Sequence, residues 1–203
     1  MLGEHFFGAE HAVFAERSLR DHAFAFFEQI RKDAGVRHRD DLRGVGGGWR
    51  AIAGIPGCEL AAADLLAAYQ VRHPRSNSLL AWHEGQIRAL ANQYNRAIPL
   101  LESARKPADQ DDAGWNFYVD ATIAFLRHDK SKLLDSRRKL AGVAFPENSG
   151  YPTLKDGILE MPTRPGQPNL RMRWPLNIDV VDGLIACFEK PYSEAYSCGP
   201  APP

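Results

Sequence analysis

The sequence predicts a mostly α-helical (all-α) fold of stacked antiparallel helical hairpins, with an irregular Pro/Gly-rich segment and a C-terminal capping helix. Three observations predict it. Apolar residues recur at helical spacing along most of the chain, proline and glycine separate these stretches, and some apolar positions repeat every thirty-six residues. A chain of 203 residues with 44% hydrophobic and 25% charged residues suits one sizeable core. We therefore expect one domain over residues 1–203.

The first predicted element is a long helix over residues 9–34. Its apolar residues lie at helical spacing, and Gly35 follows at a position where glycine commonly ends a helix. These apolar residues are Val13, Phe14, Phe24, Phe27 and Ile30. The stretch 35–57 is predicted to be irregular, because its run of three glycines before Trp49 gives the backbone little preference for one conformation.

Residues 58–142 contain a series of shorter predicted helices. Each is rich in helix-forming residues, and Pro74 and Pro107 mark two of the breaks between them. The predicted helices span 58–72, 78–91, 94–106, 115–128 and 131–142. The polar connection 108–114 contains three aspartates, which we expect to favour the N-terminus of the helix that follows.

The segment 143–173 is interrupted by prolines and glycines and is predicted to be irregular. Within it, the extended stretches 157–161 and 169–174 are expected to pair as a small hairpin. The sequence therefore predicts that the helical region is followed by an insert with little helix.

The C-terminal segment 174–192 contains a last amphipathic helix, at about 176–190, that would cap the stack. Two of its acidic residues, Asp179 and Asp182, are interpreted as a surface-exposed edge. The tail is expected to be frayed from Gly199 onward.

Apolar positions in the predicted helices recur at a period of thirty-six residues. A pattern of small, large and small side chains in the second helix of each pair would let that helix pack closely against its partner. The positions are Ala61, Leu65 and Ala68, then Ala97, Leu101 and Ala104, then Leu133, Arg137 and Leu140. The third copy keeps two of its three apolar positions.

The stretch 79–104 resembles a tetratricopeptide repeat (TPR), a helix pair that stacks with its copies into a curved array, the α-α superhelix. The residues at that family's mutual spacing are Gly85, Tyr94, Ala97, Leu101 and Ala104. The resemblance extends loosely over residues 58–142, with a period of 36 rather than the family's 34. Glu84 and Arg88 stand where the family has large apolar residues, and we interpret them as a solvated i,i+4 pair.

The resemblance implies protein–protein recognition on a concave face formed by the first helix of each pair. The candidate binding residues are Trp82, Gln86, Trp115, Tyr118 and Thr122. The aromatic side chains would receive apolar anchors of a peptide or partner protein, and the other two would orient it by hydrogen bonds. A scaffold and an inhibitor or immunity-type protein both fit this role. The alternative, that the aromatic side chains belong to the core, stays open.

Several other classes of protein do not fit the sequence. The charge balance of 25 basic and 25 acidic residues argues against a dedicated nucleic-acid binder. No apolar run approaches the roughly 20 residues that a membrane span needs. His83-Glu84 lacks the second histidine of a zinc-protease signature, because position 87 is Ile. We expect no catalytic residue, no metal and no cofactor, and we interpret the chain as non-enzymatic.

Two alternative functions remain. A small-molecule binder or enzyme would use a pocket between the helical stack and residues 143–173, since long irregular segments are often functional. Its polar groups would come from Tyr151, Asp156, Glu160 and Arg164. A structural homo-oligomer is the other alternative, and the sequence leaves the oligomeric state open.

The cysteines Cys58, Cys187 and Cys198 are too few for a metal ribbon or a disulfide framework. We interpret them as independent thiols, with a Cys187–Cys198 pair as the alternative in an oxidising compartment. The N-terminal residues lack the basic start and apolar stretch of a signal peptide, so we expect a cytoplasmic protein. A chain whose signal has been removed would look the same, which leaves a periplasmic or secreted protein open.

Overall fold

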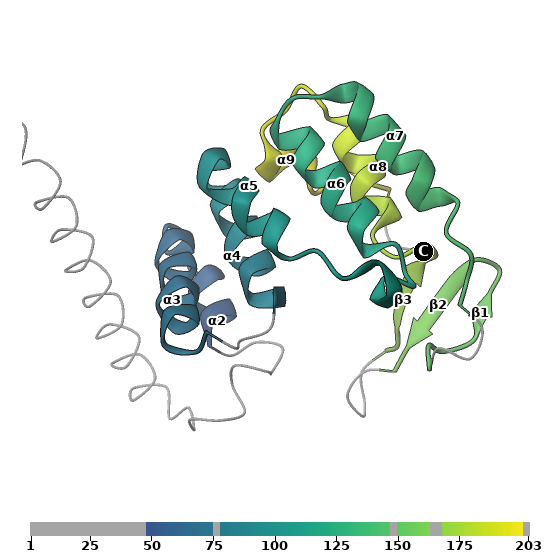
Figure 1. Cartoon of the computed structure of the whole chain (residues 1–203), viewed down its shortest axis with the longest axis horizontal. Coiled ribbons are helices and arrows are strands. Elements are labelled where there is room, and N and C mark those ends of the chain that lie inside the picture. Colours follow the sequence, from purple (N-terminus) through teal and green to yellow (C-terminus); the bar gives the residue numbers. More distant parts are fainter. Residues whose placement is uncertain (1–47, 75–77, 147–149, 163–167, 201–203) are drawn as a thin grey trace, which may run out of the picture. The chain divides into compact units, whose positions relative to one another are not determined.

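The computed structural model describes residues 48–74, 78–146, 150–162 and 168–200, and most of them are helical (Figure 1). This confirms the mostly-α prediction. The helix predicted over 9–34 lies outside the described residues. The chain divides into two compact units at Ala91. We call the described residues up to Ala91 the first unit and those from Asn92 the second unit, and the single domain expected over 1–203 stays a prediction.

The first unit contains α2 (Trp49–Ala53), α3 (Glu59–Arg72) and α4 (Ser78–Leu90). Helices α3 and α4 pack side by side and confirm the helices predicted over 58–72 and 78–91. Helix α2 shows that the prediction of an irregular stretch over 35–57 is wrong for its last part. Trp49 and Ile52 are only 7% and 2% exposed, and packing of this kind stabilises short helices more than local propensity does.

The core of the first unit lies among these three helices. Its buried side chains come from α2, from one face of α3 and from α4, and α2 packs directly on α3. The cluster consists of Trp49, Ile52, Ala62, Ala63, Leu65, Leu66 and Ile87.

The second unit is built on α6 (Trp115–Leu126) and α7 (Lys130–Ala141), which a short turn joins and which pack along each other. Helix α8 (Ile178–Ala186) packs against both. The unit also contains α5 (Tyr94–Ser103), a 3-10 turn (Ala108–Gln110) and the short α9 (Tyr192–Ala195). The predicted helices 94–106, 115–128 and 131–142 are confirmed with shifts of a few residues. The helix predicted to reach residue 190 ends at Ala186.

At the N-terminus of each of the two central helices of the second unit, α6 and α7, a carboxylate accepts hydrogen bonds from backbone N–H groups. Asp111 accepts hydrogen bonds from the backbone N–H groups of Trp115 and Asn116, at 2.6 and 2.8 Å. Asp129 accepts one from the backbone N–H of Lys132 at 3.0 Å. A negative group is favourable at a helix N-terminus. The prediction that the acidic connection favours the start of α6 is therefore confirmed.

A three-stranded antiparallel sheet follows α7, in the order β1 (Leu154–Lys155), β2 (Ile158–Met161), β3 (Leu170–Arg173). The pairing of β2 with β3 confirms the predicted hairpin. The sequence did not predict β1. It is joined to β2 by Asp156 and Gly157, whose φ values of 51° and 76° are typical of the tightest hairpin turns.

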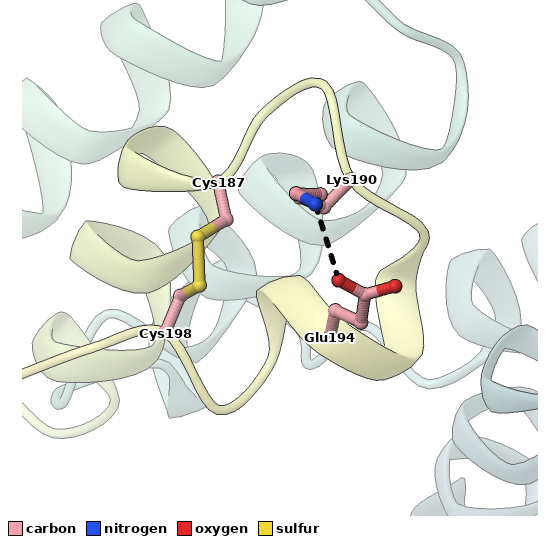
Figure 2. The surroundings of a disulfide bond; sticks show 4 residues. All are labelled: Cys187, Lys190, Glu194 and Cys198. Atoms are coloured by element: carbon pink, nitrogen blue, oxygen red, sulfur yellow. Dashed lines mark ion pairs between the residues drawn. A yellow bond between two sulfur atoms is a disulfide. The ribbon is translucent and has the colours of Figure 1, made fainter.

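A disulfide links Cys187, which directly follows α8, to Cys198, which lies three residues after α9, and so closes the C-terminal turn between them (Figure 2). The interpretation of three independent thiols is therefore wrong, and Cys58 is the free cysteine. Within the loop that the bond closes, the Lys190 ammonium lies 3.6 Å from a Glu194 carboxylate oxygen.

The expected fraying from Gly199 is also wrong at that residue. The backbone of Gly199 lies against α8 so closely that a Cβ on Gly183 would come within 2.5 Å of the Gly199 nitrogen. Because Gly183 and Gly199 have no side chains, the two backbone segments can cross at a distance that a side chain at either position would prevent. None of the described helices is long and apolar enough to cross a membrane.

Candidate interaction surface

The five candidate binding residues lie on two helices in different units. Trp82 and Gln86 belong to α4 of the first unit, and Trp115, Tyr118 and Thr122 belong to α6 of the second. Trp82, Tyr118 and Thr122 are buried. Gln86 and Trp115 are half-buried, so part of each residue is exposed to solvent.

The three candidates on α6 make contacts inside the second unit. The indole Nε1 of Trp115 donates to the carbonyl of Ala104 at 2.8 Å, and its ring meets that of Tyr118 edge-on. The Thr122 hydroxyl donates to the Tyr118 carbonyl at 3.0 Å. Burial raises the pKa of the Tyr118 hydroxyl well above its usual value. These surroundings fit the open alternative that the stripe on α6 belongs to the core.

On α4, Gln86 lies beside His83, which contacts Trp49 and Arg50 of α2. Gln86 forms a hydrogen bond with the side chain of His83. Arg50 of α2 donates to Nε2 of the same imidazole at 3.2 Å, and the rings of His83 and Trp49 lie 4.8 Å apart. Burial first, and then the Arg50 charge, lower the pKa of His83. Sequence reasoning did not find this group, because nothing local relates position 50 to position 83.

A buried network of charges connects α3 to α4. The i,i+4 pair of Glu84 and Arg88 exists, with Nε and Oε1 2.7 Å apart, but the two residues are only 5% and 2% exposed. The interpretation of a solvated pair is therefore wrong. Arg88 also contacts Asp64 of α3 at 2.9 Å, and Gln70 donates to Glu84 at 2.9 Å. Buried charges need such partners, since an unpaired one is costly.

Large apolar side chains remain exposed, and most of them are in the first unit. Among the described residues, they are Ile55, Leu60, Val71, Leu79 and Leu90 in the first unit, and Leu134 and Leu170 in the second. Val71 is the most exposed, at 72%. Leu60 and Val71 are three helical turns apart on α3 and therefore lie on the same side of it. Single exposed apolar residues are common on protein surfaces, whereas contiguous apolar patches mark interaction sites.

The residues of the alternative ligand pocket have separate surroundings. Tyr151 packs edge-on against Trp174, and its pKa is raised by burial and then by the charges of Asp112 and Asp111. Asp156 lies exposed in the hairpin turn, and Glu160 lies 3.4 Å from Arg171 on the neighbouring strand. Arg164 lies outside the described residues.

Two shallow hollows occur elsewhere on the second unit, one along α7 and one at the start of α5. The first is lined by Ser131, Lys132, Leu134, Asp135 and Arg138, and the second by the five residues 92–96. Neither of these hollows is lined by residues of 143–173.

The two acidic residues of α8 are neutralised by arginines. Asp179 lies 2.5 Å from Arg173 of β3, and Asp182 lies 2.9 Å from Arg137 of α7. Both acids are half-buried. The interpretation of a surface-exposed acidic edge is therefore wrong, because these carboxylates tie α8 to the sheet and to α7.

Within the described ranges, no group of three His, Cys, Asp or Glu side chains is arranged to hold a metal ion. Comparison with protein-family models, with curated protein sequences and with solved structures found no match.

Proposed function

We propose that this chain is a non-enzymatic protein–protein interaction module that binds a peptide or a partner protein through its first unit. The observation that carries the proposal is the number of large apolar side chains that are exposed in the described part of this unit. Five of the seven exposed large apolar side chains of the described residues belong to it. Covering such side chains is a main source of affinity in protein association.

One helix pair supports the tetratricopeptide-like part of the proposal. Helices α6 and α7, the second of the predicted pairs, pack together, and helix pairs of this kind bury their remaining faces by stacking. The pair predicted over residues 79–104 is divided between the two units at Ala91. Of the five candidate binding residues, Gln86 of the first unit would touch the partner directly, whereas Trp115 makes its contacts inside the second unit. Trp82, Tyr118 and Thr122 would hold their helices in place from below. Such a module serves either as a scaffold or as an inhibitor of one target.

The disulfide supports a periplasmic or secreted location rather than the cytoplasmic one that the N-terminal residues predict. Disulfides persist in oxidising compartments and are rare in the cytosol, where thiols are kept reduced. The Cys187–Cys198 bond therefore fits a protein that folds outside the cytosol. Alkylation of the protein freshly isolated from its source would test this, and blocking of one thiol rather than three is expected.

The interaction is tested with the full chain as bait in an extract of the source organism. We expect the double variant Leu60→Lys/Val71→Lys to lose the captured partner, because two charges would replace the apolar surface of α3. Leu170→Lys is the matched control, since Leu170 is also exposed but lies in the second unit. A partner that both variants retain equally would contradict the proposed surface. Light scattering of the purified chain tests the homo-oligomer alternative.

A further inference from the structure

Helix α2 is a short segment between glycines. It has five residues, Trp49–Ala53, too few for an isolated helix to be stable in water. Gly48 precedes it with φ of 61°, and Gly57 follows it with φ of 84°, a conformation that other residues rarely adopt. The helix therefore depends on the surface it contacts, and its flanks permit a change of direction at both ends.

Two apolar anchors attach α2 to the α3–α4 pair. Trp49 and Ile52 are three residues apart, so they lie on one side of the helix, and both are buried in the core cluster of the first unit. This is the pattern by which an amphipathic helical ligand is held by a helical receptor. The Trp49 indole Nε1 is buried and has no hydrogen-bond partner among the described residues, which makes the fit imperfect.

A polar contact fixes the orientation of α2. The Arg50 guanidinium lies 4.2 Å from the centre of the Trp49 ring and donates to Nε2 of His83. The His83 side chain is in turn hydrogen-bonded to the side chain of Gln86, one of the candidate binding residues. The contact of α2 with α4 thus depends on an aromatic residue, Trp49, that is followed directly by a cation, Arg50.

From this geometry we infer that α2 is a built-in ligand, and that the face of the α3–α4 pair it covers is a peptide-binding site. The inference goes beyond the proposed function, because this covered face is a different surface from the exposed side of α3 that carries Leu60 and Val71, and it has a partner of its own. That partner carries a short segment that becomes helical on binding, with an aromatic and an aliphatic anchor three residues apart and an arginine directly after the aromatic residue. The segment displaces α2, which leaves through its glycine flanks.

The test uses a fluorescent peptide with the sequence of residues 46–57 and the full chain carrying Trp49→Ala/Ile52→Ala. This variant removes the built-in anchors, so we expect it to bind the peptide at least about tenfold more tightly than the unchanged chain. In the unchanged chain the tethered α2 competes at a high effective concentration. A peptide with both anchors replaced by alanine should not bind. Ile55→Ala is the matched control, because Ile55 is exposed in the same segment, and it should behave like the unchanged chain.

A second variant tests the polar contact. Adding His83→Ala to the double variant should weaken peptide binding by about threefold to tenfold, as expected for the loss of one hydrogen bond and its ring contact. If the double variant keeps its helical circular dichroism but does not bind the peptide, the inference is overturned. It is also overturned if the double variant unfolds α3 and α4, because a replaceable ligand must leave a folded receptor.

Hydrogen exchange of the unchanged chain provides an independent readout. We expect the amides of Ala53, Gly54 and Ile55 to exchange at least about tenfold faster than those in the middle of α3, as a locally detaching segment does. Equal protection would overturn the inference. Neither assay requires an outside partner. A partner captured through Leu60 and Val71, together with a failed peptide assay, would therefore refute the built-in ligand and leave the proposed function standing.

Discussion

The first unit buries an ion pair and leaves several large apolar side chains exposed, whereas the ion pairs described in the second unit are at least partly exposed. In the first unit, Arg88 and Glu84 are buried among helices while Val71 is mostly exposed. In the second unit, α6 buries an almost entirely apolar surface. Its ion pair between Arg105 and Asp120 lies at the surface, with both side chains about 40% exposed.

The described parts of the two units differ in what holds them together. In the second unit, α8 packs against both α6 and α7, and the disulfide holds the C-terminal turn beside α8. The first unit uses buried positions for charges that stabilise only when every partner is present. The proposed function therefore places binding on the first unit and structural support on the second.

The largest effect is expected from Arg88→Ala. This change leaves the carboxylates of Glu84 and Asp64 without their cation, one of them buried. Breaking a buried pair in this way costs about 3–5 kcal/mol. We expect the free energy of unfolding, measured by urea denaturation with circular dichroism, to fall by that amount.

Arg105→Ala is the matched control in the second unit, because Arg105 forms an ion pair that is partly exposed. Exposed pairs contribute about 0–1 kcal/mol, so this variant should unfold nearly as the unchanged chain does. Equal losses in the two variants would remove the contrast between buried and exposed charges.

The burial of Glu84 and Arg88 could not be predicted from the sequence, although their pairing could. A spacing of four residues brings two charges together on a helix whether that side is exposed or buried. The deciding partner, Asp64, comes from another helix, 24 residues from Arg88. Helices α3 to α7 were predictable because their periodicity and breakers are local. Helix α2 was missed because glycine dominates its surroundings, although Trp49 and Ile52 already had helical spacing.

The next effect concerns the disulfide. Replacing both Cys187 and Cys198 by serine opens a loop whose ends are eleven residues apart. Loop-closure entropy predicts a loss of about 3 kcal/mol from the stability of the second unit. Urea denaturation would measure it, with Cys58→Ser as the control because Cys58 is free. If mass spectrometry of the alkylated chain finds three free thiols without a reductant, the bond does not form.

The sequence allowed this pair without requiring it, since two cysteines eleven residues apart meet only if the chain turns back. Two features produce the turn, the short α9 and the close contact of Gly199 with α8. Both depend on tertiary packing, and neither has a periodic signal. The same reason explains why α8 was predicted too long.

A smaller effect is expected from Gly183→Ala. The new Cβ would come within 2.5 Å of the Gly199 nitrogen and 3.0 Å of the Ala195 carbonyl oxygen, both of them backbone atoms. Overpacking of this kind costs about 1–3 kcal/mol, and thermal unfolding would measure the loss. Gly142→Ala is the control, because a Cβ there meets only ordinary contacts at 3.5 and 3.7 Å. Tolerance of both changes would mean that the C-terminal turn does not hold its place on α8.

The smallest effect is a pH dependence confined to the first unit. Burial and the Arg50 charge lower the pKa of His83 below 6.5, so the unfolded chain binds a proton more readily than the folded one. The stability from neutral His83 is fully present above pH 6.5 and is lost as the pH falls through the lower, folded-state pKa. We expect His83→Gln to flatten the change of the urea midpoint between pH 7 and pH 5. His128→Gln should leave that change as it is, because His128 is exposed in the second unit. If neither variant flattens it, acid acts on groups other than His83.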